Sequence, residues 1–287
     1  MRRPVTKEVD AMYTRCVCVS LAGGIALMLA MVHTDTAVSE QGKRMRLLVV
    51  THSAGFMHDP VRRPAPDRLS VCEEVVMGLG LITGAYDCTF IYTKEECQKL
   101  TPDFLKQFDG FFFYATGDLP IPEEGRKALI ELVKEGRGFI GAHAATDALY
   151  NYQPFGEMIG GYFDGHPWHQ KVRVIVEDKE HPATAHLGDA FEIVDEIYQF
   201  REPYSRERLR VLLSLDINSV DVKKGKRKDN DYALAWVQQF GKGRVFYTAL
   251  GHSNQVWRDE RFQKHLLNGI LWALGLLKGD ATPRPKP

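Results

Sequence analysis

The sequence lacks the motifs of several common enzyme and binding classes. It contains no CxxC pair, no GxSxG elbow, no P-loop and no HExxH motif. One GxGxxG spelling, Gly136 to Gly141, runs into a predicted strand rather than out of one, so it does not predict a dinucleotide site. These absences argue against a zinc ribbon, a serine hydrolase of the elbow type and a bound nucleotide.

Excess charge and abundant cysteine are also absent. Lys+Arg and Asp+Glu both number 37, and this balance argues against nucleic acid or an anionic membrane surface as the main partner. Beyond residue 38 the chain keeps only Cys72, Cys88 and Cys97, an odd number that predicts no disulfide framework. The 287 residues are enough for one large domain with a buried core.

Residues 1–38 have the character of a secretory signal peptide or an N-terminal anchor. Four basic residues precede an apolar run from Cys16 to Val32, and polar residues follow it (the basic residues are Arg2, Arg3, Lys7 and Arg15). We therefore expect a secreted or periplasmic protein, whose only association with a membrane would be through this segment if it stays uncleaved.

Strands and helices alternate through the first half of the remaining chain. Apolar runs predict buried strands at residues 46–53, 86–92, 110–116 and 138–143, and helical spacing predicts helices at 67–79, 101–108 and 122–135. This alternation predicts a parallel sheet with helices on both faces. After Gly160, segments 171–177, 191–200 and 210–215 alternate apolar and polar residues, and 232–238 and 244–249 flank a hairpin turn. The second half is therefore an antiparallel extension, followed by a helix at 262–277 and a disordered tail at 278–287.

The most informative segment is GFIGAHAATD, residues 138–147. An apolar strand ends at His143, and the small residues that follow predict a sharp turn into a helix. Such a turn lifts one side chain above the carboxyl edge of a sheet, where other enzymes of this architecture carry a nucleophile. An imidazole at that position can bind a metal or move a proton near neutral pH.

Two further histidines follow predicted strands. His52 ends the first strand, and His252 lies just past the strand at 244–249. Ligands of open α/β sheets bind beyond the carboxyl ends of strands, so the rings of His52, His143 and His252 could converge there. Imidazole and carboxylate ligands suit a divalent metal such as zinc, which makes these three histidines candidate metal ligands. Alternatively, each of the three rings forms only hydrogen bonds that stabilise the fold.

Carboxylates near the strand ends are candidate partners for these rings. Asp147 lies four residues after His143 and could orient its ring or act in catalysis. Alternatively, it is simply an acidic residue at the N-terminus of a helix, where the helix dipole favours a negative charge. Asp118 follows the third strand and could bind substrate or simply form a turn. Asp195 and Glu196 point to opposite faces of a strand, and we expect Glu196 at the site, with Tyr198 on the same face.

The loop at residues 161–169 is rich in glycine and aromatic residues. Tyr162 and Trp168 could stack on a sugar, and His166 could bind substrate or pair with His169 at a metal. The competing interpretations are a packed structural loop and a subunit contact in a homodimer.

Four runs, in order, resemble the ThuA-like (trehalose utilisation) family: GFIGAHAATDALY, GGYFDGHP, DEIYQF and GKGRVFYTALGH. The resemblance covers about residues 45–277. It implies the fold of the class I glutamine amidotransferases, an α/β flavodoxin-like, doubly wound and mostly parallel sheet. In those enzymes the elbow carries a nucleophilic cysteine, whereas His143 stands near that position here, so glutamine hydrolysis is not implied. The resemblance also implies a role in sugar metabolism, on oxidised (keto) glycosides.

The leading hypothesis is an exported enzyme acting on a small carbohydrate, either a glycoside or a keto-sugar. His143, Glu196 and Asp147 would carry hydrolase, lyase or isomerase chemistry, by acid–base catalysis or with a metal. The alternative is a non-catalytic sugar-binding domain on an inherited enzyme fold.

Overall fold

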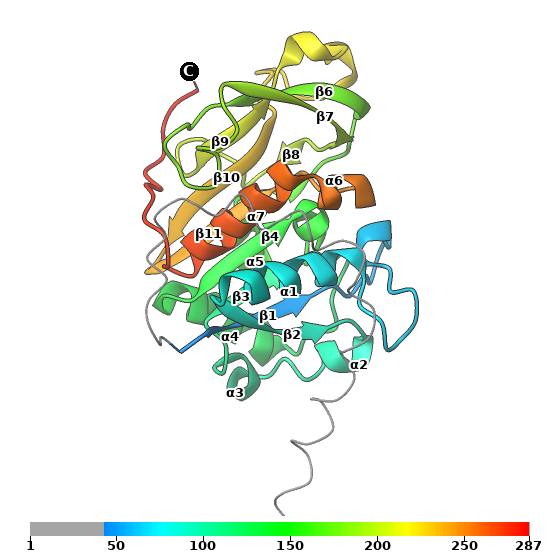
Figure 1. Ribbon diagram of the computed structural model, residues 1–287, viewed down its shortest axis with the longest axis vertical. Coiled ribbons are helices and arrows are strands. Elements are labelled where there is room, and N and C mark those ends of the chain that lie inside the picture. Colours follow the sequence, from blue (N-terminus) through cyan, green and yellow to red (C-terminus); the bar gives the residue numbers. More distant parts are fainter. Residues whose placement is uncertain (1–42, 287) are drawn as a thin grey trace, which may run out of the picture. The chain divides into compact units, whose positions relative to one another are not determined.

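The structure is a computed structural model that describes residues 43–286, and the segment 1–38 proposed as a signal peptide or anchor lies outside the described residues. A nine-stranded sheet runs through the described part in the order β2-β1-β3-β4-β11-β10-β9-β6-β7 (Figure 1). Its parallel half consists of β1 (Met45–Val50), β2 (Tyr86–Ile91), β3 (Gly110–Phe113), β4 (Gly138–Ala142) and β11 (Gly243–Thr248). This is the 2-1-3-4-5 order of flavodoxin-like folds, as predicted.

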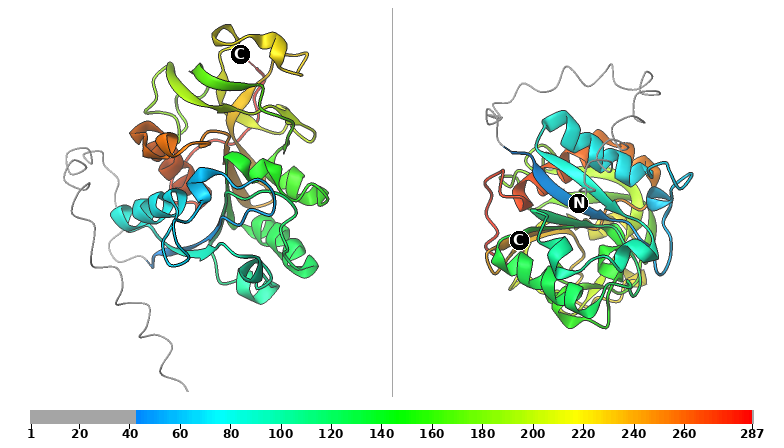
Figure 2. Two further views of the ribbon diagram at one scale, coloured as in Figure 1. Left: turned by 90° about the vertical axis from the view of Figure 1, so that its right-hand side faces the viewer. Right: turned by 90° about the horizontal axis from the view of Figure 1, so that it is seen from below.

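The inner strands of the parallel half, β1, β3, β4 and β11, are buried on both faces, which explains their continuous apolar runs, whereas the edge strand β2 is partly exposed. Residues 47–50 of β1 and 110–113 of β3 are fully enclosed. Helices α1 (Val71–Thr83), α6 (Asn254–Arg258) and α7 (Glu260–Ala273) cover one face, and α3 (Pro102–Leu105), α4 (Glu123–Glu135) and α5 (Gln153–Ile159) cover the other (Figures 1 and 2). The short helix α2 (Lys94–Cys97) follows β2.

Helix α1 begins four residues later than its apolar spacing predicts. Ser70 caps it, accepting a hydrogen bond from the Glu73 backbone, while the Glu73 side chain accepts one from the Ser70 backbone. This capping box fixes the helix start and leaves residues 51–69 as a long loop between β1 and α1. That loop lies at the carboxyl edge of the parallel strands.

The second half forms the predicted antiparallel extension. It contains β6 (Trp168–Val176), β7 (Ala190–Ile197), β9 (Arg210–Leu215) and β10 (Ala233–Phe240). The steps from β11 through β10, β9 and β6 to β7 are all antiparallel. Four reversals return the chain to its original direction, so the carboxyl end of β7 lies at the same edge as those of β4 and β11. A separate two-stranded sheet pairs β5 (Tyr162–Phe163) with β8 (Phe200–Arg201).

The structure describes residues 278–286 of the tail that the sequence predicts to be disordered. This part of the tail has no helix or strand, and side chains of the domain form hydrogen bonds and an ion pair with it. Trp272 donates to the Gly279 carbonyl at 3.1 Å, and Arg210 pairs with Asp280 at 2.8 Å. Among the described residues, no helix is long and apolar enough to cross a membrane.

Candidate functional site

His143 sits at a strained elbow directly after β4. Its φ of 42° is unusual for a residue with a side chain, and the chain continues as a short 3-10 turn, His143–Asp147, rather than the α-helix predicted there. The Tyr247 hydroxyl donates to the His143 carbonyl at 2.7 Å and holds this conformation. Such strain persists only where surrounding contacts enforce it, and it is typical of functional sites.

Three imidazoles and one carboxylate meet above this elbow. Ligand atoms of His58, His143, Glu196 and His252 all lie within 4.8 Å of one another. The Glu196 carboxylate oxygen Oε2 is 3.5 Å from Nε2 of His143 and 3.1 Å from Nδ1 of His252, and those two nitrogens are 3.3 Å apart. We call these four residues the histidine–glutamate cluster.

The protonation of His143 makes the cluster suited to a cation. Nδ1 of His143 lies 2.6 Å from the Ala249 carbonyl, which can only accept, so Nδ1 carries the proton. When His143 is neutral, its Nε2 lone pair points toward the Glu196 carboxylate, which is also an acceptor. Nearby imidazoles hold the pKa of Glu196 well below its usual range against the opposing effect of burial, so the carboxylate is ionised. A positive charge among these atoms would remove their repulsion.

His58 supplies the fourth group from the β1–α1 loop. It is buried, and within residues 43–286 its Nδ1 has no hydrogen-bond partner. Burial, with His143 and His252 close by, lowers the pKa of His58 to about 3, so its ring is neutral near pH 7. Its ring centroid lies 4.9 Å from that of His143. A neutral imidazole with an unpaired nitrogen is the form that binds metals.

A buried ion pair anchors the loop that carries His58. Arg63 contacts both carboxylate oxygens of Glu73, at 2.8 Å from Nε to Oε2 and 2.9 Å from Nη2 to Oε1. Thr51, at the end of β1, donates to the same carboxylate at 2.7 Å. The Glu73 side chain thus ties the loop to both the sheet and helix α1.

Alternation on β7 separates the two acidic neighbours as predicted. Glu196 joins the cluster, whereas the buried Asp195 accepts hydrogen bonds from the backbone of Gly251 at 2.7 Å and His252 at 3.0 Å. Asp195 therefore fixes the loop that presents His252. Tyr198, on the Glu196 side, is buried with its ring centroid 4.2 Å from that of His143, so it forms the wall behind the histidine.

Exposed side chains lie beside the cluster, around Glu196, His252 and His58. His166, predicted to bind substrate, is 52% exposed and places Nδ1 3.3 Å from the Glu196 carboxylate. His169 lies directly opposite Glu196 on β6, and its ring centroid is 4.9 Å from that of His252. Phe56 is 67% exposed, and its ring lies edge-on to that of His58 with 4.8 Å between the ring centroids.

Three predicted residues stand apart from the cluster. Nδ1 of His52 bonds to the Tyr92 carbonyl at 2.9 Å, so His58, from the same loop, replaces it among the candidate ligands. Asp118 is exposed and pairs with Arg126 at 3.1 Å. Asp147 does not orient His143, because the Ala249 carbonyl does; instead it accepts from Tyr150 at 2.5 Å. Burial raises the pKa of Asp147.

The two aromatic residues proposed for sugar stacking are buried in the protein. Trp168 is 1% exposed, begins β6 and donates to the Asp221 carbonyl at 3.0 Å. The Tyr162 hydroxyl donates to the Tyr152 carbonyl at 2.9 Å and accepts from the Gly156 backbone at 3.1 Å. Neither ring has a free face for a sugar, so the predicted stacking on Tyr162 and Trp168 is wrong.

The sequence predicted no role for Phe56, placed His58 only as a residue that could line the cleft, and suggested His169 only as a possible metal partner of His166. Strand pairing could have indicated His169, because it lies opposite Glu196 in the β6–β7 register. His58 and Phe56 lie in an irregular loop without periodicity, and their positions depend on the anchor at Glu73.

Comparison with known proteins supports one family. The family model ThuA, described as trehalose utilisation, matches residues 46–273. A solved ThuA-like protein from Bacteroides uniformis has a TM-score of 0.64 and 22% identity, with 82% of this chain and 94% of that chain covered. One from Parabacteroides merdae has a TM-score of 0.65 and 20% identity, with 83% and 93% covered. No curated protein matches the chain. The expected class I glutamine amidotransferase-like fold is confirmed.

Proposed function

Because the chain belongs to the ThuA (trehalose utilisation) family, we propose that it is an enzyme of carbohydrate metabolism whose active centre is the histidine–glutamate cluster. The substrate class is a glycoside or keto-sugar. The reaction is proton transfer or bond cleavage next to an oxygen of that sugar, which places the protein among the hydrolases, lyases or isomerases. His143 stands where an amidotransferase needs a cysteine nucleophile, so glutamine hydrolysis is not proposed.

The observation that carries the proposal is the spacing of the ligand atoms. Tetrahedral ligands at zinc bond lengths of roughly 2.0–2.1 Å lie about 3.3–3.4 Å from one another. The three distances among Glu196 Oε2, His143 Nε2 and His252 Nδ1 are 3.1, 3.3 and 3.5 Å. His58, buried and with its Nδ1 lacking a hydrogen-bond partner among the described residues, is the fourth candidate. The donor set of imidazoles and carboxylate suits zinc, and the Ala249 carbonyl fixes the His143 tautomer as metal sites require.

A bound divalent metal would polarise a sugar oxygen or lower the pKa of a water molecule. The chain's own residues supply the remaining functions. His166, half-exposed beside Glu196, is placed to give or take a proton at the opening. Asp147, with its raised pKa, is a second candidate acid. Phe56 offers an exposed ring next to His58, on which the apolar face of a sugar can stack.

Export is a separate part of the proposal and rests on residues 1–38. The basic start and the apolar run Cys16–Val32 direct the chain to the periplasm or the cell exterior. Fractionation of expressing cells, followed by N-terminal sequencing of the recovered protein, tests this. Recovery of the full-length chain from the cytoplasm would contradict it.

The test of the enzymatic proposal is metal analysis combined with turnover of a panel of keto-glycosides. Glu196→Gln keeps the shape of the side chain and removes its charge, and we expect turnover to fall about 10²-fold or more, with loss of bound metal. His52→Ala is the matched control, because that ring lies outside the cluster. Sugar binding without any turnover in the metal-loaded wild type would favour the non-catalytic sugar-binding alternative.

A further inference from the structure

The short loop between β5 and β6, residues 164–167, carries His166 beside the histidine–glutamate cluster. Nδ1 of His166 lies 3.3 Å from Oε1 of Glu196. The other carboxylate oxygen, Oε2, contacts His143 and His252. Because the His166 side chain is 52% exposed, burial does not fix its position, and the contacts of the loop must do so.

Gln199 holds this loop from the end of β7. It lies two residues after the end of the strand that carries Glu196, and it is 2% exposed. Its backbone carbonyl accepts from the Asp164 backbone at 2.8 Å, and its backbone N–H donates to the Gly165 carbonyl at 3.0 Å. Its side-chain Nε2 donates to the Asp164 carbonyl at 3.0 Å. Three hydrogen bonds therefore join the two residues before His166 to one buried residue.

Lys226 holds the same loop from the long connection between β9 and β10, residues 216–232. Its backbone N–H donates to Oε1 of Gln199 at 2.8 Å, so the Gln199 amide uses both its oxygen and its nitrogen. Its Nζ donates to the Asp164 carbonyl at 3.0 Å and to the Asp164 carboxylate at 2.9 Å. The Lys226 side chain is 62% exposed, so this ion pair adds little to the stability of the fold. Its effect is on where the loop lies.

The loop sequence restricts the backbone on both sides of His166. Gly165 has a φ of 105°, a conformation that residues with a side chain rarely adopt. Pro167 disfavours helical conformations of the residue before it, which is His166. The main freedom left to the loop is movement as a unit, and the bonds to Gln199 and Lys226 oppose that movement.

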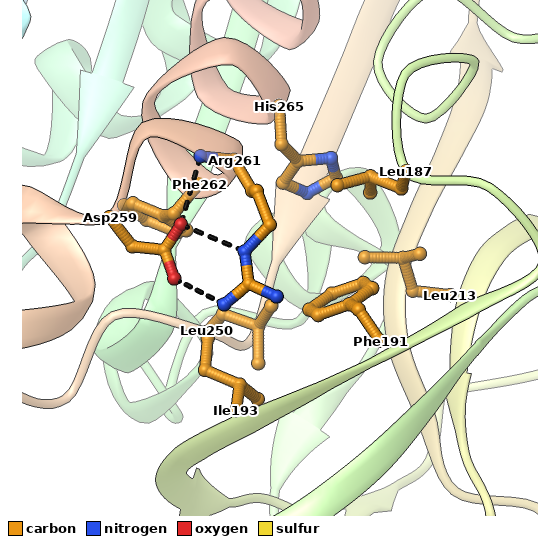
Figure 3. A pocket seen from close by; sticks show the side chains of 9 residues that line it. All are labelled: Leu187, Phe191, Ile193, Leu213, Leu250, Asp259, Arg261, Phe262 and His265. Carbon is orange, nitrogen blue, oxygen red and sulfur yellow. Dashed lines mark hydrogen bonds and ion pairs between the residues drawn. The ribbon is translucent and has the colours of Figure 1, made fainter.

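Strand β7 is a rigid support for Gln199. At the other end of the strand, the ring centre of Phe191 lies 5.3 Å from the guanidinium of Arg261, which the Asp259 carboxylate holds with two hydrogen bonds (Figure 3). The cavity drawn in Figure 3, beside β7 and α7, has a volume of about 10 Å³, room for roughly one water molecule. The strand is thus closely packed, and a loop tied to it is tied to a fixed element.

We propose that Gln199 and Lys226 are positioning residues that hold the His166 imidazole against Glu196 for proton transfer at the exposed side of the cluster. This inference rests on the proposed function, which assigns that proton transfer to His166. Both residues act through the backbone of residues 164–165 and touch no reacting atom. A group that transfers a proton has to stay within roughly 0.5 Å of its productive position, and these bonds keep it there.

Lys226→Met tests the proposal, because it keeps most of the length of the side chain and removes both bonds from Nζ to Asp164. We expect kcat on the keto-glycoside panel to fall about 10-fold with KM unchanged, since a displaced imidazole still permits binding but transfers the proton less often. Gln199→Met removes the bonds of the amide and should act in the same way. Lys226→Arg keeps the donors and should restore most of kcat. Lys228→Met is the matched control, because Lys228 is exposed and has no ion pair within residues 43–286.

The loss of kcat has to act through His166. In a His166→Ala background, Lys226→Met should cause no further loss of kcat. The NMR signal of the His166 ring in histidine-labelled, metal-free protein gives a readout without turnover, and its absence in His166→Ala identifies it. This ring stacks on Phe163 with 5.8 Å between the centroids, so its ring-current shift reports its position. Lys226→Met and Gln199→Met should move the signal, whereas Lys226→Arg and Lys228→Met should not.

Two results would overturn the inference: a His166 signal that stays in place in both Lys226→Met and Gln199→Met, or an equal loss of kcat with and without His166. Failure of the proposed function gives a different result. A wild-type protein that turns over no sugar of the panel would remove the enzyme, and the NMR comparison would still decide whether Gln199 and Lys226 position His166.

Discussion

The replacement His58→Ala tests the metal centre through thermal stability. A ligand that binds only the folded chain stabilises it by about 2.7 kcal/mol at a concentration 100 times its dissociation constant. For a domain of this size, that corresponds to a rise of about 5–11 °C in Tm. We expect this rise when zinc is added to the chelator-treated wild-type protein, because four ligand atoms lie within 4.8 Å of one another.

His58→Ala removes one of these ligands. Loss of a group that only supports a ligand already costs about 10–100-fold in metal affinity, so loss of the ligand itself should cost at least 100-fold. At the same zinc concentration, the remaining stabilisation is about 0.4 kcal/mol, or about 1–2 °C. Differential scanning calorimetry with and without zinc measures the change within each variant, so any destabilisation by the substitution itself cancels.

His52→Ala is the control for this experiment, since it removes an imidazole from the same loop but outside the cluster. Its zinc-dependent rise should match that of wild type. An equal rise in wild type and His58→Ala, or a loss confined to His52→Ala, would refute the assignment of His58 as a ligand.

Three further predictions concern the framework of the site and of the domain. Tyr247→Phe removes the 2.7 Å hydrogen bond to the buried His143 carbonyl and leaves it only the longer bond from the Thr146 hydroxyl at 3.5 Å, so chemical denaturation should show a loss of about 1–3 kcal/mol, and turnover should fall with it. Unchanged stability and turnover would contradict this. Trp168→Ala should lower the free energy of unfolding by about 3–5 kcal/mol in the same assay, because the ring is buried rather than available to sugar. A variant of unchanged stability that binds sugar less tightly would show instead that the ring contacts the sugar. Burial alone would raise the pKa of Asp231, but hydrogen bonding to Arg206 outweighs it and holds that pKa below its usual range. The pair therefore stabilises the fold above the ordinary carboxyl pKa of about 3.9, and this contribution is lost as the pH falls through the lower folded value. Asp231→Asn should destabilise by about 3 kcal/mol at pH 7, with a difference from wild type that shrinks below about pH 4; a constant difference would count against the pairing.

Much of the fold follows from sequence patterns. Continuous apolar runs identified four of the five parallel strands, and alternation after Gly160 identified the antiparallel extension. The prediction was wrong for β11, which was assigned to the antiparallel half but pairs in parallel with β4. The same logic placed His143 and His252 at one edge of the sheet. Alternation also distinguished Glu196 from Asp195, because a strand directs neighbouring side chains to opposite faces.

The site residues that were predicted wrongly depend on long-range contacts, which local sequence patterns do not reveal. His58 reaches the cluster because a buried ion pair between Arg63 and Glu73 fixes its loop, and such long-range contacts leave no periodic signal. Trp168 lies in what resembles an exposed aromatic loop, but strand β6 already begins there and buries the ring. His52 lies two residues beyond the end of β1 rather than at its last position, and its ring nitrogen Nδ1 is bonded to the backbone carbonyl of Tyr92.

The most direct test of the account is a crystal structure of the zinc-loaded protein, with anomalous scattering recorded on both sides of the zinc absorption edge. The account predicts one anomalous peak per chain, bonded to nitrogens of His143 and His252 and to an oxygen of Glu196 at roughly 2.0–2.1 Å, with the His58 ring turned toward it. A map with no peak among these side chains, or with zinc held only elsewhere on the chain, would contradict it.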